Sequence, residues 1–166
     1  GDVKFDNPDT AGRDIRWDSS DDTLEFSDNT KAGFGNSKDL QIYHDGSNSY
    51  VHDTGTGELK LAGSVVRIVN AGNSETQLKA SQNGSVELYY NNALKLKTNS
   101  DGTRHTGHCT PATTNTYNLG SSSLRWNNLY INDMHFSNEG SQNSVDGTWG
   151  DWTLQEGEED IFMLNN

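Results

Sequence analysis

Three side chains that could take part in proton transfer or polar binding stand together in the stretch DLQIYHDGSNSYV, at Tyr43, His44 and Asp45. A phenol, an imidazole and a carboxylate serve enzymes as acids and bases, and serve binding sites as hydrogen-bond partners. Asp45-Gly46 is also a typical hairpin turn, with apolar residues on both sides of it. We therefore expect the cluster to turn the chain, with Tyr43 and His44 as contacts to another molecule if their side chains face outward.

A second group of reactive side chains lies in the stretch RHTGHC, where His105, His108 and Cys109 are all capable ligands for a transition metal. Two residues separate the histidines, a spacing that places both rings on one face of a helix but not of a strand. No second Cys/His pair follows, which argues against a zinc finger. We expect a polar turn and no cofactor, with a metal held by His105 and His108 as the alternative.

Carboxylates are abundant and could form the acid–base pair of a glycosidase, which needs two of them a few ångströms apart across a sugar. The densest run, QEGEED from Gln155 to Asp160, stands between two apolar stretches, so we expect a solvated turn between two strands there. The chain has no G-x-S-x-G elbow, and its five histidines have no recognisable partner arrangement. The sequence therefore indicates a protein that is not an enzyme, with polysaccharide hydrolysis as the alternative.

The four tryptophans are the most informative aromatic residues. Trp17 and Trp126 fit the strand pattern of the chain, so we expect both to lie in its core. Trp149 and Trp152 stand in a glycine-containing stretch near the C-terminal end. Exposed indole rings stack on sugar faces, so these two residues are candidates for glycan contacts, with packing as the alternative role of Trp149.

The composition restricts the partners of the chain. A net charge of -12 and a pI near 4.6 argue against nucleic acid, because phosphate binding needs a basic face. No apolar run approaches the roughly 20 residues of a membrane span, so we expect a soluble chain without membrane insertion. Leu, Ile, Val and Phe make up only 30 of the 166 residues, a share typical of disordered chains. These residues recur periodically, however, and the chain also has four Trp and six Tyr, which bury large areas. We therefore expect a folded chain that shares a core with other copies.

Short apolar-x-apolar pairs recur along the chain and predict strands, since side chains alternate between the two faces of a strand. The pairs are Ile15/Trp17, Leu24/Phe26, Leu40/Ile42, Leu59/Leu61, Val66/Ile68, Val86/Leu88, Leu94/Leu96, Leu129/Ile131 and Trp152/Leu154. Between them stand turn formers that adopt positive φ angles at low cost: Asp28-Asn29, Asp45-Gly46, Gly55-Thr56-Gly57, Asn83-Gly84, Asn91-Asn92 and Asp101-Gly102. No stretch has the apolar spacing of a helix. The sequence predicts an all-β fold of short strands and hairpins with almost no helix.

Three segments resemble sequences of the tail-fibre and other virion-fibre proteins of tailed bacteriophages, notably phages of marine cyanobacteria. DLQIYHDGSNSYV is similar to a repeat of such fibres. NLGSSSLRWNNLYINDMHF, residues 118–136, resembles a recurrent segment near the end of their shaft. VDGTWGDWTLQEGEEDIFMLNN, residues 145–166, is similar to their terminal module.

The resemblance implies an elongated, intertwined homotrimeric fibre on a virion, built as a triple-stranded β-helix or a β-prism. Residues 1–117 would form a repetitive β-rich shaft, residues 118–136 the fibre repeat segment, and residues 137–166 a C-terminal hairpin module. That module is expected to be truncated, because members of the family run on past the matching end. Some such fibres hold metal ions on the trimer axis through two histidines separated by one residue. His105 and His108 depart from this pattern, because two residues separate them.

The resemblance also implies the partners: other copies of the chain, other virion tail proteins, and a glycan or protein receptor on the host cell. Tyr43, His44, Trp149 and Trp152 are then the candidate receptor contacts. Two alternatives remain open, a depolymerase of the host envelope polysaccharide and a passive head or neck fibre without receptor binding.

Overall fold

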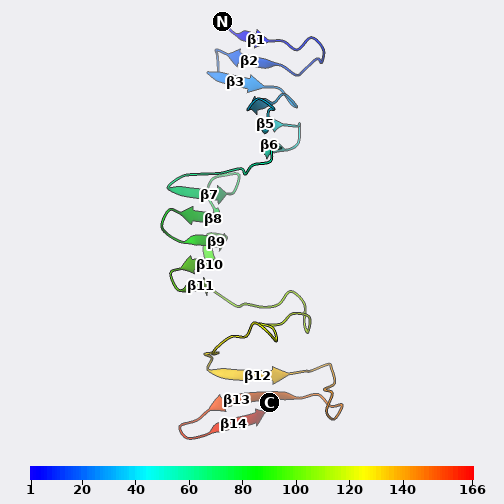
Figure 1. The fold of residues 1–166 in the computed structure, drawn as a ribbon, viewed down its shortest axis with the longest axis vertical. Coiled ribbons are helices and arrows are strands. Elements are labelled where there is room, and N and C mark those ends of the chain that lie inside the picture. Colours follow the sequence, from blue (N-terminus) through cyan, green and yellow to red (C-terminus); the bar gives the residue numbers. More distant parts are fainter. The chain divides into compact units, whose positions relative to one another are not determined.

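The structure, a computed structural model, describes all residues from Gly1 to Asn166. The chain is all-β, with 14 strands in four antiparallel sheets, no helix and no closed sheet (Figure 1). It divides into two units, residues 1–108 and residues 109–166. No helix long and apolar enough to cross a membrane is present. The predicted all-β character and the absence of helix are confirmed.

Unit 1 contains three sheets. Their strands are β1 (Val3–Phe5), β2 (Ile15–Asp18) and β3 (Thr23–Phe26); β4 (Ala32–Phe34), β5 (Leu40–His44) and β6 (Ser49–Asp53); and β7 (Val65–Val69), β8 (Thr76–Ser81), β9 (Val86–Tyr90), β10 (Ala93–Asn99) and β11 (Gly102–His105). Unit 2 contains one sheet of β12 (Asp133–Ser137), β13 (Asp151–Glu156) and β14 (Ile161–Asn165). In every sheet the strands are hydrogen-bonded in chain order, so each sheet is a meander of neighbouring hairpins.

The predicted turn formers close several of these hairpins. Asn91 and Asn92 join β9 to β10 with φ angles of 49° and 59°, the left-handed pair of a type I′ turn. Asn83 has a φ of 53° between β8 and β9, and Gly46 has a φ of 94° between β5 and β6. Residues 157–160 of the acidic run lie between β13 and β14, as predicted, whereas Gln155 and Glu156 still belong to β13.

Two predicted strands are wrong. Leu59/Leu61 lies in the strandless stretch between β6 and β7, and Leu129/Ile131 lies between β11 and β12. An apolar-x-apolar pair describes the two faces of a strand but supplies no hydrogen-bond partner, and neither stretch pairs with another strand. Trp126 also lies outside any strand, so it does not fit the predicted strand pattern, and in the single chain it is 69% exposed.

The β1–β3 sheet carries its apolar side chains on one face. The strand register aligns Val3, Trp17 and Leu24 in one row across the sheet, and Phe5, Ile15 and Phe26 in the next. The opposite face is polar and internally paired. Arg16 Nη2 lies 2.7 Å from carboxylate oxygens of both Glu25 and Asp18. Hydrogen bonding to Glu25, with the charge of Asp18 beside it, raises the pKa of Arg16.

The five-stranded sheet of β7–β11 has the same division. Ile68, Leu78, Leu88 and Leu96 form a row across four strands, and a second row contains Val66, Ala80 and Val86. On the opposite face Glu87 accepts hydrogen bonds from the Tyr89 hydroxyl, from Ser85 Oγ at 2.7 Å and from Lys79 Nζ at 3.2 Å. These bonds, that of Tyr89 first, lower the pKa of Glu87 to about 2.

The two remaining sheets repeat this arrangement. In the β4–β6 sheet the apolar face carries Phe34, Leu40, Ile42 and Val51. In the β12–β14 sheet the register places Phe136 beside Trp152, and Met134 beside Leu154 and Met163. Strand β14 is the exception, because Phe162 and Leu164 also point to its other face.

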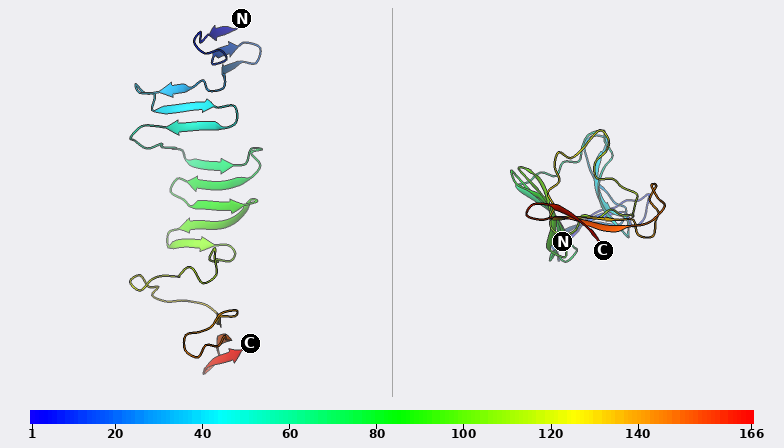
Figure 2. Two further views of the ribbon diagram at one scale, coloured as in Figure 1. Left: turned by 90° about the vertical axis from the view of Figure 1, so that its right-hand side faces the viewer. Right: turned by 90° about the horizontal axis from the view of Figure 1, so that it is seen from below.

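None of the apolar faces is covered within the chain. Figure 2 shows the β7–β11 sheet as a single layer, with no helix or second sheet of its unit against either face. No hydrophobic residue is buried, and the one buried residue is Asp18, which is 7% exposed. The chain exposes 14059 Å² of surface, whereas a compact protein of 18.3 kDa exposes about 8,100 Å². The single chain therefore leaves about 5,900 Å² more surface open to solvent than a compact protein of its mass.

Candidate functional site

A cleft lies beside the loop that joins β12 to β13, residues 138–150. Hydrogen bonds fix the conformation of this loop. Asn143 Oδ1 accepts from the backbone N–H groups of Val145 and Asp146 at 2.8 and 3.0 Å. Asp146 Oδ1 in turn accepts from the N–H of Thr148 at 3.0 Å and from its hydroxyl at 2.8 Å. These bonds to Thr148, followed by that from Asn143, lower the pKa of Asp146.

The base of the loop is closed by Asn138 and Gly150. Gly150 N donates to Asn138 Oδ1 at 2.7 Å, and Asn138 N donates to the Gly150 carbonyl at 3.1 Å. Trp149 therefore stands between two fixed points, Thr148 and Gly150. Its indole ring is 61% exposed. A large aromatic ring that is held by its backbone but left open to solvent is suited to bind another molecule.

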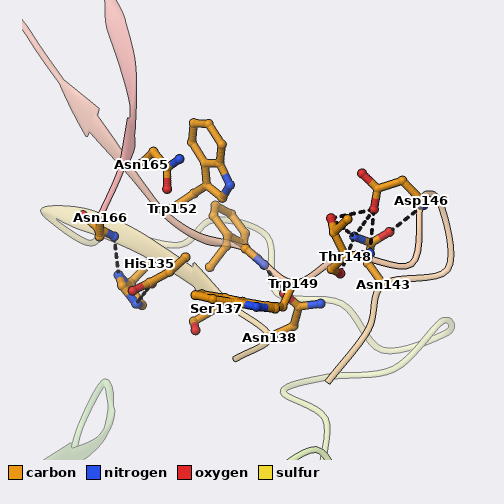
Figure 3. Close-up of a pocket in the computed structure, with 13 residues that line it drawn as sticks. His135, Ser137, Asn138, Asn143, Asp146, Thr148, Trp149, Trp152, Asn165 and Asn166 are labelled. Atoms are coloured by element: carbon orange, nitrogen blue, oxygen red, sulfur yellow. Dashed lines mark hydrogen bonds and ion pairs between the residues drawn. The ribbon is translucent and has the colours of Figure 1, made fainter. Parts of the chain in front are cut away.

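The cleft has a volume of about 890 Å³, and we call it the Trp149 cleft. Its lining comes from β12, the loop, the start of β13 and the C-terminal end (Figure 3): His135, Phe136, Ser137, Asn138, Asn143, Asp146, Thr148, Trp149, Gly150, Asp151, Trp152, Asn165 and Asn166. Trp149 also borders a second hollow, lined by Glu139, Gly140, Ser141 and Gln142. The structure thus brings both predicted tryptophans, Trp149 and Trp152, into one cleft.

Trp152 has a different environment from Trp149. It lies on the apolar face of the β12–β14 sheet, opposite Phe136 and in line with Leu154 along β13. Its indole also packs over Gly150, where an added Cβ would lie 2.9 Å from Trp152 Nε1. The position of Trp152 favours packing, whereas that of Trp149 favours contact with a ligand.

A cluster of polar side chains occupies the other face of the same sheet. His135 Nδ1 lies 3.2 Å from Thr153 Oγ1, and His135 Nε2 lies 2.7 Å from Asp151 Oδ1. That oxygen has no hydrogen-bond partner, so the contact with His135 is close but lacks the alignment of a hydrogen bond. The order of carboxylate, imidazole and hydroxyl is that of a nucleophilic triad.

The surroundings of this cluster differ from those of a nucleophilic site. Thr153 lies at the centre of the sheet, and β13 is paired on both sides, with β12 and with β14. Its backbone N–H groups are therefore used in the ladders and are not free to stabilise an oxyanion. The arrangement is suited to holding β12 and β13 in register and to offering hydrogen bonds at the edge of the Trp149 cleft.

Tyr43 and His44 lie on opposite faces of β5. Tyr43 stacks on Tyr50 with ring centroids 4.6 Å apart, and Lys31 Nζ lies 4.5 Å from the centroid of the Tyr43 ring. His44 shares the apolar face with Ile42, and its Nδ1 lies 3.1 Å from Ser49 Oγ. The structure therefore separates the two predicted receptor contacts and does not form one site from them.

Asp45 belongs to the hairpin turn between β5 and β6. Its Oδ1 accepts from the backbone N–H groups of Asn48 at 2.7 Å and Ser47 at 2.9 Å, and its Oδ2 accepts from the Tyr50 hydroxyl at 2.8 Å. The bond from Asn48, followed by that from Tyr50, lowers the pKa of Asp45. The cluster of Tyr43, His44 and Asp45 thus contains a carboxylate that holds the hairpin turn.

His105 and His108 do not belong to the same strand. His105 ends β11 and pairs with Leu96 on the apolar side of the β7–β11 sheet, whereas His108 lies beyond the strand. No group of three or more His, Cys, Asp or Glu side chains in the chain is arranged to hold a metal ion. Cys109 is exposed and is not in a disulfide.

Sequence reasoning did not find most of the residues around Trp149. Asn138, Asn143, Asp146 and Thr148 read as ordinary loop residues, and the Asp146-Gly147 dipeptide was the one local signal of a tight turn. The contact of His135 with Asp151 depends on the register of β12 and β13, which joins residues across the whole loop. Comparison with known proteins adds no relative: no family model matches the chain, and no curated protein or solved structure is significantly similar to it.

Proposed function

We propose that the chain is a structural subunit of a homotrimeric virion fibre, with the Trp149 cleft presented to a receptor on the host cell surface. The fibre itself, its three copies and its place on a phage virion rest on the resemblance of three sequence segments. The structural observation that carries the proposal is the set of four uncovered apolar sheet faces.

The large exposed surface of the chain favours association with other copies. The chain exposes about 5,900 Å² more than a compact protein of its mass, and a standard interface covers about 800 Å² per partner. Hydrophobic burial is the main term that offsets chain entropy on folding, and the single chain buries no hydrophobic residue. An obligate assembly, in which the copies fold and associate together, supplies the missing term.

The polar faces indicate which side of each sheet points outward in the assembly. Arg16 is paired with Glu25 and Asp18, Lys79 is paired with Glu87, and no other chain is needed to complete these contacts. Paired charges are stable facing water, whereas the apolar rows on the reverse faces are not. We therefore assign the apolar faces to a shared core around the fibre axis and the polar faces to its surface.

The Trp149 cleft is the part of the surface best suited to receptor binding. Its exposed indole could stack on a sugar ring while Asn138, Asn143 and Thr148 supply polar edges around it. Asp146 and Asp151 also line the cleft, so a neutral glycan fits it better than an acidic one. Three clefts per fibre would bind a cell surface with an avidity far above that of one site.

Polysaccharide hydrolysis is the alternative that the same cleft allows. A glycosidase needs a general acid whose pKa is raised, whereas the pKa of Asp146 is lowered by its hydrogen bonds to Thr148. This difference favours binding without cleavage. Release of reducing ends from host polysaccharide, lost on Asp146→Asn or Asp151→Asn substitution, would establish the enzyme instead.

Two measurements test the proposal. Light scattering on the purified chain should give the mass of three copies, about 55 kDa from 3 × 18.3 kDa, and a folded single chain would refute the shared core. Binding of the assembly to arrays of neutral and acidic oligosaccharides should be lost in Trp149→Ala and kept in Val145→Ala, which alters the same loop outside the cleft lining. A trimer that adsorbs to no host cell or glycan would be a passive fibre.

A further inference from the structure

The 24 residues that precede β12, residues 109–132, contain no strand, and we call them the strandless segment. Seven large apolar side chains of this segment are exposed: Tyr117, Leu119, Leu124, Trp126, Leu129, Tyr130 and Ile131. The exposure reaches 89% at Tyr130. Its side-chain and turn hydrogen bonds join residues of the segment to one another, and none reaches β12–β14. Six of the seven side chains are more than half exposed, and only Ile131, at the end of the segment, borders residues of β12–β14.

The segment nevertheless has a defined local conformation. Ser121 N donates to the Leu124 carbonyl at 2.8 Å, and Leu124 N donates to Ser121 Oγ at 3.0 Å. Gly120 precedes this turn with a φ of 85°, and an added Cβ would lie 3.0 Å from the Leu124 carbonyl oxygen and 3.6 Å from Trp126 Cδ1. The Leu124 backbone and the Trp126 side chain therefore both lie close to Gly120, and both side chains remain exposed. Aromatic residues in a shaped, apolar surface are typical of interfaces rather than of disordered linkers.

The charge of the segment points to the chemistry of its partner. The chain carries 24 carboxylate residues, yet none falls between Asp101 and Asp133, and Arg125 is the one charged residue of the strandless segment. Because the chain has a net charge of -12, the rest of it carries -13. An acidic neighbour would repel most of this chain, but not this segment. Another copy of the same chain is such a neighbour, and it brings uncovered apolar faces of its own.

We propose that the strandless segment packs against neighbouring copies of the chain, with Leu124 and Trp126 buried between chains, and so clasps the copies together where the hydrogen-bonded sheets are interrupted. This inference rests on the proposed homo-oligomer and assigns the interchain contact to particular residues. The clasp holds the copies through side chains, since the segment has no strand edge to pair with a neighbour.

A photo-crosslinker at Trp126 tests the contact in the full assembly. Trp126→benzoylphenylalanine, irradiated in the native state and then denatured, should give a covalent pair of chains of about 36.6 kDa, from 2 × 18.3 kDa. The matched control is Val145→benzoylphenylalanine. Val145 is 93% exposed in the single chain, but it lies in the loop of residues 138–150 beside the Trp149 cleft, which is proposed to face the receptor and not another copy. Adducts from Trp126 and not from Val145 support the clasp. An assembled protein with no interchain adduct from Trp126, or with equal adducts from both positions, overturns it.

A second probe covers the case in which the photo-crosslinker prevents assembly. In a Cys109→Ser background, Leu124→Cys should react with a maleimide about tenfold more slowly than Val145→Cys while the assembly is intact, and at the same rate after unfolding. Equal native rates would overturn the clasp. The mass of the wild-type protein distinguishes failure of the proposed fibre from failure of the clasp. A single chain would refute the fibre, whereas an assembly in which Leu124→Cys is accessible would refute the clasp alone.

Discussion

Replacement of Leu88 by aspartate gives the most direct test of the shared core. Leu88 lies in the middle of the apolar row of the β7–β11 sheet, between Leu78 and Leu96, and is 40% exposed in the single chain. Covering that remaining part should contribute about 1 kcal/mol per copy. A carboxylate in its place adds a desolvation cost of about 3 kcal/mol or more. The loss is then about 4 kcal/mol per copy and about 12 kcal/mol for three copies, which weakens the association constant of a trimer by a factor of more than about 10⁸.

The control for this test is Val65→Asp on the same sheet. Val65 is 46% exposed in the single chain, close to the value for Leu88, but it lies on the opposite face with Arg67 and Lys79. Light scattering should show a trimer for the wild type and for Val65→Asp, and single chains or aggregates for Leu88→Asp. Equal masses for the two variants would refute the assignment of inner and outer faces. A trimer that keeps its mass with Leu88→Asp would show that the row is not buried between copies.

Three further outcomes are expected. Trp149→Ala should reduce adsorption to host cells about tenfold or more without changing the mass of the assembly, since one exposed stacking ring is lost from each of three sites; unchanged adsorption would remove the Trp149 cleft from receptor binding. The pKa of Glu87 is lowered from 4.5 to about 2, so its contribution to stability should be present above about pH 4.5 and be lost as the pH falls through about 2. Between pH 5 and 2 the melting temperature should therefore fall more steeply for the wild type than for Glu87→Gln. Parallel curves of melting temperature against pH would contradict a stabilising role of the Glu87 carboxylate. Gly120→Ala should lower stability by about 1 kcal/mol or more, because φ is 85° and the new Cβ would press on the Leu124 carbonyl; an unchanged melting temperature would mean that the turn is not required.

The local structure of the chain could be predicted from its residues. The alternation of apolar and polar residues predicted most of the strands, because a strand places successive side chains on opposite faces. Asn91-Asn92 and Asn83-Gly84 predicted hairpin turns because Asn and Gly accept a positive φ, and both turns are present. The same reasoning failed at Leu59/Leu61 and Leu129/Ile131, where no second strand is available to pair with.

The register of the strands decided what the sequence pattern left open. Alternation along β5 was enough to put Tyr43 and His44 on opposite faces, because they are adjacent in one strand, whereas only the register of β12 and β13 brought His135 next to Asp151. It also gave Trp149 and Trp152 different surroundings, one on a fixed open loop and one on an apolar face. Side-chain type and spacing determine that this chain forms short amphipathic strands. Only hydrogen bonding between residues far apart in the chain decides which side chains meet, because register is a property of strand pairs and not of one strand.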